Sequence, residues 1–262
     1  HVAVGARQLV PEVRPAELTT VYDLASVTKV FATATAIMLL HESGSIDLEA
    51  AVSKYLPVPA FGQFTVLHCL THTAGLNPGK PFYTECNTID AMLERYAAMP
   101  LNWPPGTRWL YSDVGFMVLG RIVETVSGET LDAFCQKRIF TPLDMKDTRF
   151  NPPADWATRC AATEQCPWRG KLMIGQVHDE NTYAVGGVAG HAGLFGTAPD
   201  IAIYLRALLT GKILKSDSVD RMLKLGLVPA WPWQGLGWQL DAWPTKNFGS
   251  LPTRDSAGHA GW

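Results

Sequence analysis

Hydrophobic positions along the chain predict a series of short helices in the middle and strands towards both ends. The most apolar stretch is 30–40, where nearly every face of a helix would be hydrophobic, so we expect this helix to lie buried at the centre. Gly44 stands where its C-terminal cap belongs. Apolar residues at helical spacing predict further helices over 65–72, 88–96, 114–124, 131–140, 201–209 and 218–224.

Residues with capping side chains mark where several of these helices begin. Thr88 is a predicted N-cap, and either Ser112 or Asp113 is suited to cap the helix that follows it. Residues 197–200 have the form of a capping box in which Asp200 replaces the usual Glu or Gln.

Strand signals lie near both ends of the chain. Residues 1–5 resemble the tail of a strand, residues 235–243 alternate like a strand, and residues 256–262 are predicted to pair with them. Residues 108–111, between two predicted helices, also have strand-like composition.

The stretch 141–190 carries few periodic patterns and many Pro, Gly and polar residues, so we expect a long irregular excursion there. No repeat or low-complexity linker divides the chain. The pattern therefore predicts one α+β domain over 1–262, with a helical lobe at roughly 45–200 and a sheet to which both ends contribute.

Composition narrows the possible classes of function. A chain of 262 residues with 47% hydrophobic residues has enough apolar side chains for a substantial core, and its net charge of −2 without a basic stripe argues against nucleic-acid binding. No apolar run reaches the roughly 18 residues of a membrane span. The five cysteines show no C-x-x-C pair, and whether Cys160 and Cys166 are bridged across a loop is left open.

The strongest chemical signal is Ser26 followed three residues later by Lys29, at the start of the apolar helix. Residues at this spacing share a helix face, so a hydroxyl and an amine are placed together. A lysine made neutral by burial takes the proton from a serine and turns it into a nucleophile. The N-terminus of the helix adds backbone N–H groups and the positive end of its dipole.

Metal chemistry is the less favoured interpretation of the histidines. His68 and His72 are four residues apart, but the Glu of an H-E-x-x-H motif is missing between them, so core or capping roles are predicted. Residues 178–181 are consecutive and cannot all face one ion, which favours hydrogen bonds that pin their loop. We expect no metal or cofactor, and a metal-dependent hydrolase that uses His68, His72 or His178 is the alternative.

Three segments together carry a resemblance to a known family. Residues 26–29 (Ser-Val-Thr-Lys), 111–113 (Tyr-Ser-Asp) and 259–261 (His-Ala-Gly) resemble the S-x-x-K, Y-x-N and K-T-G motifs of the serine β-lactamase and penicillin-binding protein superfamily. The tyrosine is typical of the class C-like branch, which includes D,D-peptidases and esterases. Residues 70–76 and 190–195 also look like segments of that branch.

The resemblance implies an antiparallel β-sheet flanked by helices with an all-helical lobe. It implies that Ser26 attacks a carbonyl while Lys29 and Tyr111 share the proton transfer. Asp113 departs from the usual Asn, and its carboxylate would favour the charged form of Lys29. Members of the family have more strands before the nucleophile, and more strand and a final helix after the third motif, so we expect the sequence to be incomplete at both ends.

The third motif contributes further expected site residues. Ala260 and Gly261 would offer a strand edge to the substrate, and the N–H of Trp262 would form the oxyanion hole with that of the nucleophile. His259, in place of Lys, would bind a substrate carboxylate or orient the motif tyrosine. The other His-Ala-Gly copy, at His191, is predicted to be a packing turn.

The resemblance therefore implies a bacterial serine hydrolase that forms an acyl-enzyme on amide or ester carbonyls, of the D,D-peptidase (carboxypeptidase), penicillin-binding or esterase type. The alternatives are a β-lactamase and a sensor that binds β-lactams or peptidoglycan without turnover. A small-molecule or peptidoglycan-peptide substrate is implied, with β-lactams as acylating ligands. A wall-peptide substrate would place the protein outside the cytoplasm, in the periplasm or cell envelope, and an esterase would fit the cytoplasm. The oligomeric state is left open.

Overall fold

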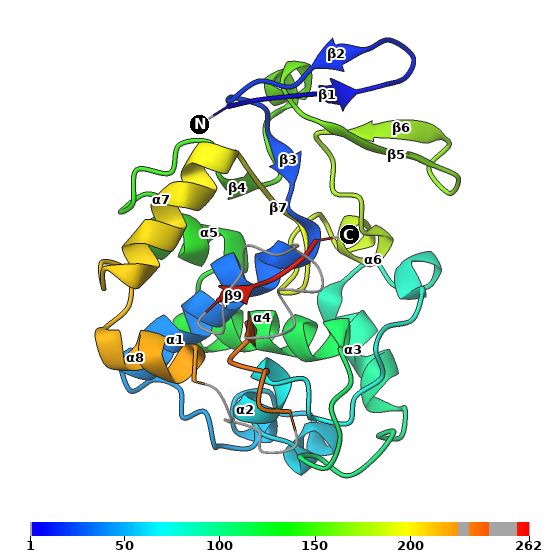
Figure 1. Cartoon of the computed structure of the whole chain (residues 1–262). Helices are drawn as coiled ribbons and strands as arrows, with labels where there is room; N and C mark the ends of the chain where they lie inside the picture. The colour runs from blue at the N-terminus through cyan, green and yellow to red at the C-terminus, as the bar shows by residue number, and fades with distance from the viewer. Residues whose placement is uncertain (1, 225–230, 241–255, 262) are drawn as a thin grey trace.

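The computed structural model describes residues 2–224, 231–240 and 256–261, which form helices and small sheets in one mixed arrangement (Figure 1). The α-helices are α1 (Thr35–Glu42), α2 (Val66–Leu70), α3 (Ile89–Ala97), α4 (Asp113–Ser127), α5 (Leu131–Cys135), α6 (Glu180–Ala184), α7 (Ala198–Leu209) and α8 (Ser216–Met222). Tighter 3-10 turns are η1 (Ala25–Val27), η3 (Val52–Lys54), η4 (Pro59–Gln63), η5 (Phe82–Thr84) and η7 (Ala154–Thr158), and wider π-helical turns are η2 (Lys29–Ala34) and η6 (Gln136–Phe140).

The predicted apolar helix is confirmed at the centre of the molecule, where η1, η2 and α1 follow one another and both η2 and α1 lie against α4 (Figure 1). Every residue from Val30 to Met38 is buried. Gly44 closes the helix with φ of +76°, a conformation that suits glycine. The central position follows from the absence of a polar face, because each side of the helix gains from contact with a neighbour.

Within the described residues, the strands form four small antiparallel sheets: β1 (Ala6–Gln8) with β2 (Arg14–Pro15); β3 (Tyr22–Asp23), β7 (Leu194–Gly196) and β4 (Arg149–Phe150); β5 (Ala162–Cys166) with β6 (Lys171–Ile174); and β8 (Gln239–Leu240) with β9 (Ala257–Gly258). The predicted pairing of the last two segments is confirmed, since Gln239 lies opposite Gly258. The described strands from the two ends lie in separate sheets, because β3 takes its partner from the middle of the chain. The division into a sheet and a helical lobe stays a prediction.

Two local expectations are wrong. The excursion 141–190 contains β4, the β5–β6 hairpin and α6, and the hairpin turn closes where Gly170 adopts φ of +64° and its N–H bonds the carbonyl of Cys166. The hairpin was missed because its strands are half exposed and mixed in polarity. Residues 108–111 are not a strand, because the N–H of Leu110 bonds the carbonyl of His72 instead of a neighbouring strand.

Helix caps follow the sequence closely. Thr88 caps α3, and Ser112 rather than Asp113 caps α4. Thr197 caps α7 as predicted, but the capping box is incomplete, because the carboxylate of Asp200 accepts hydrogen bonds from Asp147 and Thr148 at 2.9 Å each. The side chain at the third helical position accepts a hydrogen bond from the N–H of the N-cap residue only where no donor from another segment competes for it.

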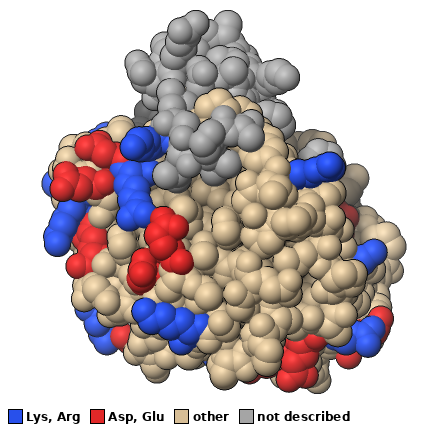
Figure 2. Space-filling view, turned by 90° about the horizontal axis from the view of Figure 1, so that it is seen from below, with Lys and Arg blue, Asp and Glu red and all other residues tan. Residues whose placement is uncertain are grey.

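Within the described ranges, none of the helices is long and apolar enough to cross a lipid bilayer. Acidic and basic side chains lie next to one another on the face shown in Figure 2, beside a broad area that carries neither, so that face is not basic throughout. All five cysteines are free thiols in buried positions, so Cys160 and Cys166 are not bridged.

Candidate active site

A tight turn presents Ser26 at the start of the central helix. The side chain of Asp23 accepts a hydrogen bond from the N–H of Ala25 at 2.8 Å, and Ala25 adopts φ of +46°, which is unusual for a residue with a Cβ. The turn η1 then passes directly into η2, which begins with Lys29. Ser26 and Lys29 therefore lie on one side of the turn, as their spacing predicts.

Lys29 is fully buried, and its ammonium group has a partner for each of its three hydrogens. Its Nζ donates to Ser26 Oγ at 3.1 Å and to the carbonyl of His191 at 2.9 Å, and it lies 2.7 Å from Asp113 Oδ1. Burial opposes the charge and lowers the pKa of Lys29, but the Asp113 carboxylate, helped by Tyr111, outweighs burial and raises that pKa above its ordinary value. Lys29 is thus held as a cation next to Ser26.

Tyr111 lies over this ion pair. Its ring centroid is 5.0 Å from Lys29 Nζ, and His72 stacks on it with ring centroids 4.5 Å apart. His72 Nδ1 accepts a hydrogen bond from the N–H of Ser112, which fixes the ring. Burial, with the charge of Lys29, lowers the pKa of His72 well below its usual value, so His72 is neutral. Sequence reasoning missed this support for Tyr111, although it did predict a core role for His72.

His259 completes the group from the third motif. Its ring lies 6.0 Å from that of Tyr111, and its Nδ1 lies 2.7 Å from the carbonyl of Ala260, so Nδ1 carries the proton. Burial, with a smaller effect of Lys29, lowers the pKa of His259 to about 4. The other ring nitrogen, Nε2, is buried without a hydrogen-bond partner in the described structure. His259 is therefore a neutral imidazole with an unused acceptor.

The strand edge of the third motif passes close to the nucleophile turn. A Cβ on Gly261 would lie 2.6 Å from the carbonyl oxygen of Leu24, so only glycine fits there, and both Ala260 and Gly261 are exposed. Trp262, the expected second donor of the oxyanion hole, lies outside the described residues. The described part of the third motif thus sits next to Ser26, as expected.

His191, which was predicted to be a packing turn, also holds Lys29 in place. Its carbonyl accepts a hydrogen bond from Lys29, and its ring Nε2 lies 3.0 Å from Asp179 Oδ1 and 3.2 Å from Thr182 Oγ1. Burial opposes the charge of Asp179, but His191 and two contacts with Thr182 outweigh it, and the pKa of Asp179 is lowered below its usual range. The ionised Asp179 caps α6 through the N–H of Thr182. The prediction that this loop is pinned by hydrogen bonds is confirmed.

The histidines considered as metal ligands have other partners. His68 completes a capping box with Thr65 at the start of α2. In the described part of the chain, the residues whose ligand atoms lie within 4.8 Å of one another are Glu164, Cys166 and Glu180. Arg169 Nε donates to Cys166 Sγ at 3.1 Å, and this fixed positive charge disfavours a metal ion on the thiol.

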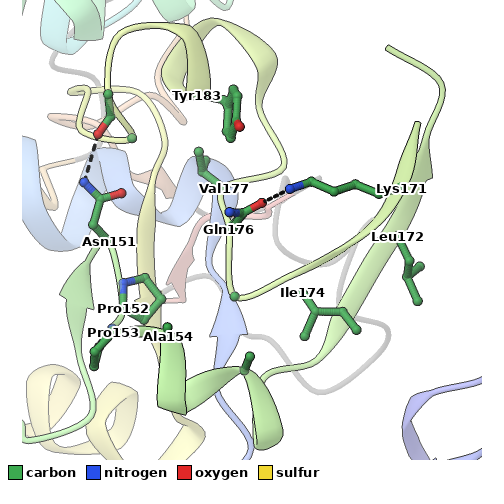
Figure 3. A pocket seen from close by; sticks show the side chains of 14 residues that line it. Asn151, Pro152, Pro153, Ala154, Lys171, Leu172, Ile174, Gln176, Val177 and Tyr183 are labelled. Carbon is green, nitrogen blue, oxygen red and sulfur yellow. Dashed lines mark hydrogen bonds between the residues drawn. The ribbon is translucent and has the colours of Figure 1, made fainter. Parts of the chain in front are cut away.

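Two cavities flank the β5–β6 hairpin. One, of about 580 Å³, is lined by Asn151, Lys171 and Tyr183 among others, and contains none of the expected site residues (Figure 3). Its polar side chains bond within it or to its rim, since Lys171 reaches Gln176 at 2.6 Å and Asn151 reaches the carbonyl of Gly186 at 2.8 Å. The second, of about 510 Å³, is lined by Leu24, Ala25, Val27 and Gly261, which surround Ser26. A third, of about 410 Å³, is lined by Val27, Val30 and His259 among others, so the second and third cavities both adjoin the turn that carries Ser26.

Comparisons with known proteins agree with this geometry. Residues 2–262 match the family described as Beta-lactamase. Among curated proteins, the chain is 34% identical over 282 residues to the "Putative D-alanyl-D-alanine carboxypeptidase" of Salmonella agona (strain SL483) and to that of Salmonella typhi, covering 93% of this chain and 65% of each relative. The chain thus spans 65% of the length of these curated relatives.

Solved structures show the same fold. The octameric penicillin-binding protein homologue from Pyrococcus abyssi aligns with a TM-score of 0.71 at 25% identity, over 89% of this chain and 56% of that one. The D-amino acid amidase from Ochrobactrum anthropi SV3, complexed with L-phenylalanine amide, aligns with a TM-score of 0.73 at 23% identity, over 90% and 71% of the two chains. The penicillin-binding protein from Bacillus halodurans aligns with a TM-score of 0.69 at 24% identity, over 85% of this chain and 70% of that one.

Proposed function

Because the chain belongs to the beta-lactamase family, we propose that it is a serine hydrolase in which Ser26 forms an acyl-enzyme with an amide or ester carbonyl. The observation that carries the proposal is the contact of the buried Lys29 Nζ with both Ser26 Oγ and Asp113 Oδ1. A buried ammonium at a serine hydroxyl is costly to maintain without a function, since a structural lysine would extend to water.

The charge of Lys29 decides which groups can accept the hydroxyl proton of Ser26. As a cation, Lys29 donates to Ser26 Oγ and stabilises the negative charge that develops there, so another group takes the serine proton as the carbonyl is attacked. Tyr111, whose ring lies over Lys29 Nζ at 5.0 Å, is our candidate for this group, and the unbonded Nε2 of His259 is the acceptor to which Tyr111 passes the proton on. The same groups return the proton to the leaving amine or alcohol, and water then releases the acyl group from Ser26.

Carbonyl polarisation is assigned to two backbone N–H groups. The N–H of Ser26 is one donor, and the N–H of Trp262 would be the other. The close passage of Gly261 over Leu24 supports this pairing, since it brings the chain just before Trp262 against the turn that carries the nucleophile.

For the substrate class, we favour a peptide amide of the D,D-carboxypeptidase type, as in the names of the curated relatives. In such a substrate the third-motif residue would face a terminal carboxylate. His259 is neutral with a bare acceptor nitrogen, which suits proton transfer through Tyr111 better than binding an anion. A wall peptide would place the protein outside the cytoplasm. This property of His259 favours the second candidate, an esterase, because an ester substrate needs no terminal carboxylate.

The test is intact-protein mass spectrometry with time, after addition of a penicillin, an activated phosphonate or p-nitrophenyl acetate, together with release of D-alanine from an N-acetylated peptide that ends in D-Ala-D-Ala. We expect an adduct on Ser26 and its loss in Ser26→Ala. Ser216→Ala, at an exposed serine that begins α8, is the matched control and should label normally.

The outcomes separate the candidates. Release of D-alanine supports the carboxypeptidase, and ester turnover without it supports the esterase. Rapid release of an opened β-lactam would indicate a β-lactamase, and a lasting adduct without turnover a sensor. Labelling that survives Ser26→Ala, or activity that disappears with a chelator, would remove Ser26 from the proposed role.

A further inference from the structure

The cavity next to Ser26 also carries an acidic group that the proposed mechanism does not use. It has a volume of about 510 Å³ and is lined by Asp23, Glu164 and His178 in addition to the nucleophile turn and Gly261. This volume suits a substrate side chain or small peptide group. Resting on the proposed function, we propose that Glu164 selects substrates that carry a positively charged group next to the carbonyl attacked by Ser26.

Glu164 has a carboxylate oxygen that accepts no hydrogen bond in the described structure. Its Oε1 is buried and has no hydrogen-bond partner in the described structure, although His178 Nε2 lies 3.2 Å away, whereas the side chain as a whole is 35% exposed and lines the cavity. The carboxylate of Glu180 lies within 4.8 Å of that of Glu164, and Glu180 forms no ion pair within the described residues. Two carboxylates this close repel each other unless a cation lies near them.

The other charged groups around the cavity already have partners. Both oxygens of Asp23 accept backbone hydrogen bonds, from Ala25 at 2.8 Å and His178 at 2.7 Å. Lys29 is paired with Asp113, as described above. Arg169 directs its guanidinium to the carbonyls of Val177 and His178 and to Cys166, not to either carboxylate. Glu164 is therefore the acidic group of the cavity that is available to a ligand.

The walls that carry Glu164 and His178 are held rigidly against the nucleophile. Glu164 lies in β5, which is paired with β6, and the N–H of His178 is bonded to the same aspartate that pins the Ser26 turn. The carboxylate is thus preorganised relative to Ser26, which favours discrimination between substrates. An ammonium or guanidinium group fits better than a metal ion, because a metal would need the Cys166 thiol that faces Arg169.

The test compares p-nitrophenyl esters of Nα-acetyl-lysine, Nα-acetyl-norleucine and Nα-acetyl-glutamate, each in both enantiomers. These esters share the leaving group and have cationic, neutral and anionic side chains. We expect kcat/KM for the lysine ester to exceed that for the norleucine ester by about 10- to 100-fold, with the glutamate ester slowest, since a charge-assisted hydrogen bond is worth this much.

Variants locate the preference. Glu164→Gln should bring the lysine-to-norleucine ratio close to one, and Glu164→Lys should favour the glutamate ester. Glu94→Gln, an exposed glutamate on α3, is the matched control and should keep the ratio.

Wild-type turnover of all three esters at equal rates, or a ratio unchanged by Glu164→Gln, would overturn this proposal and leave the hydrolase intact. Absence of both turnover and phosphonate labelling would overturn the proposed function and this inference with it. If the preference disappears with a chelator and returns with Zn²⁺, Glu164 binds a metal ion and not the ammonium group of the substrate, and the proposal is overturned.

Discussion

The ion pair between Lys29 and Asp113 gives the most direct test of the electrostatics of the site. Lys29 is fully buried and Asp113 is 34% exposed, with 2.7 Å between Nζ and Oδ1. Asp113→Asn keeps the shape and an acceptor oxygen but removes the negative charge. It also restores the residue type usual in the family motif, so the site geometry should tolerate it.

The magnitude follows from the distance and the exposure. Coulomb's law at 2.7 Å gives about 6 kcal/mol for an effective dielectric constant of about 20. Because Asp113 is 34% exposed, water screens the pair, and an effective constant of about 40 to 80 reduces the attraction to about 1.5–3 kcal/mol. We therefore expect Asp113→Asn to lower the free energy of unfolding at pH 7 by about 2 kcal/mol.

The assay is urea unfolding of four proteins: the wild type, Asp113→Asn, Lys29→Met and the double variant. The double variant should lose about 1.5–3 kcal/mol less of its free energy of unfolding than the two single variants lose together, because no unpaired charge is left buried. Asp90→Asn is the matched control, since Asp90 is 60% exposed and forms a surface pair with Arg121, and it should cost about 0–1 kcal/mol.

The pH dependence gives a second check on the same pair. The folded-state pKa of Lys29 is raised above 10.5, so the stability that the pair confers is present below that pH and is lost as pH rises through the folded value. The difference in free energy of unfolding between the wild type and Asp113→Asn should therefore become smaller above about pH 10.5. A variant as stable as the wild type, or a coupling energy within about 0.5 kcal/mol of zero, would refute the reasoning.

Two further predictions concern packing and pH. Gly120→Ala would place a Cβ 2.9 Å from the Cα of Gly190, so we expect a loss of about 1–3 kcal/mol in urea unfolding; a neutral effect would mean that the two segments separate easily. The pKa values of His72 and His259 are lowered in the fold, so the unfolded chain binds protons first and stability should fall as pH drops from about 6.5 towards 4. His259→Gln should reduce this acid loss, and an equal loss in both proteins would exclude His259 as a cause.

The local features of the site could be predicted from the sequence because they depend on neighbours along the chain. The three-residue spacing of Ser26 and Lys29 places them together in any helical turn, and the structure shows their contact at 3.1 Å. Thr88, Ser112 and Thr197 cap the helices that follow them, since a cap needs only a side chain and the next few N–H groups.

The sequence alone did not determine the charge of Lys29. The sequence showed that a carboxylate at Asp113 would favour the cation if the two met, but burial alone would have neutralised the lysine. The decisive contacts come from distant segments, since the carbonyl of His191 is 162 residues away in sequence. The tertiary structure therefore decided that Lys29 is a donor in the resting site.

The environments of the histidines and of Glu164 were also decided by the tertiary structure. His72 and His259 have the same intrinsic pKa as any exposed histidine, and their burial near Lys29 is what lowers the pKa of each in the fold. Glu164 lies in a strand whose mixed polarity gave no signal, and it lines the cavity together with Asp23, which is distant in sequence. Helix starts and motif spacing are short-range properties that the sequence determines, whereas charge states and cavity walls depend on which distant segments are packed together and how much water they exclude.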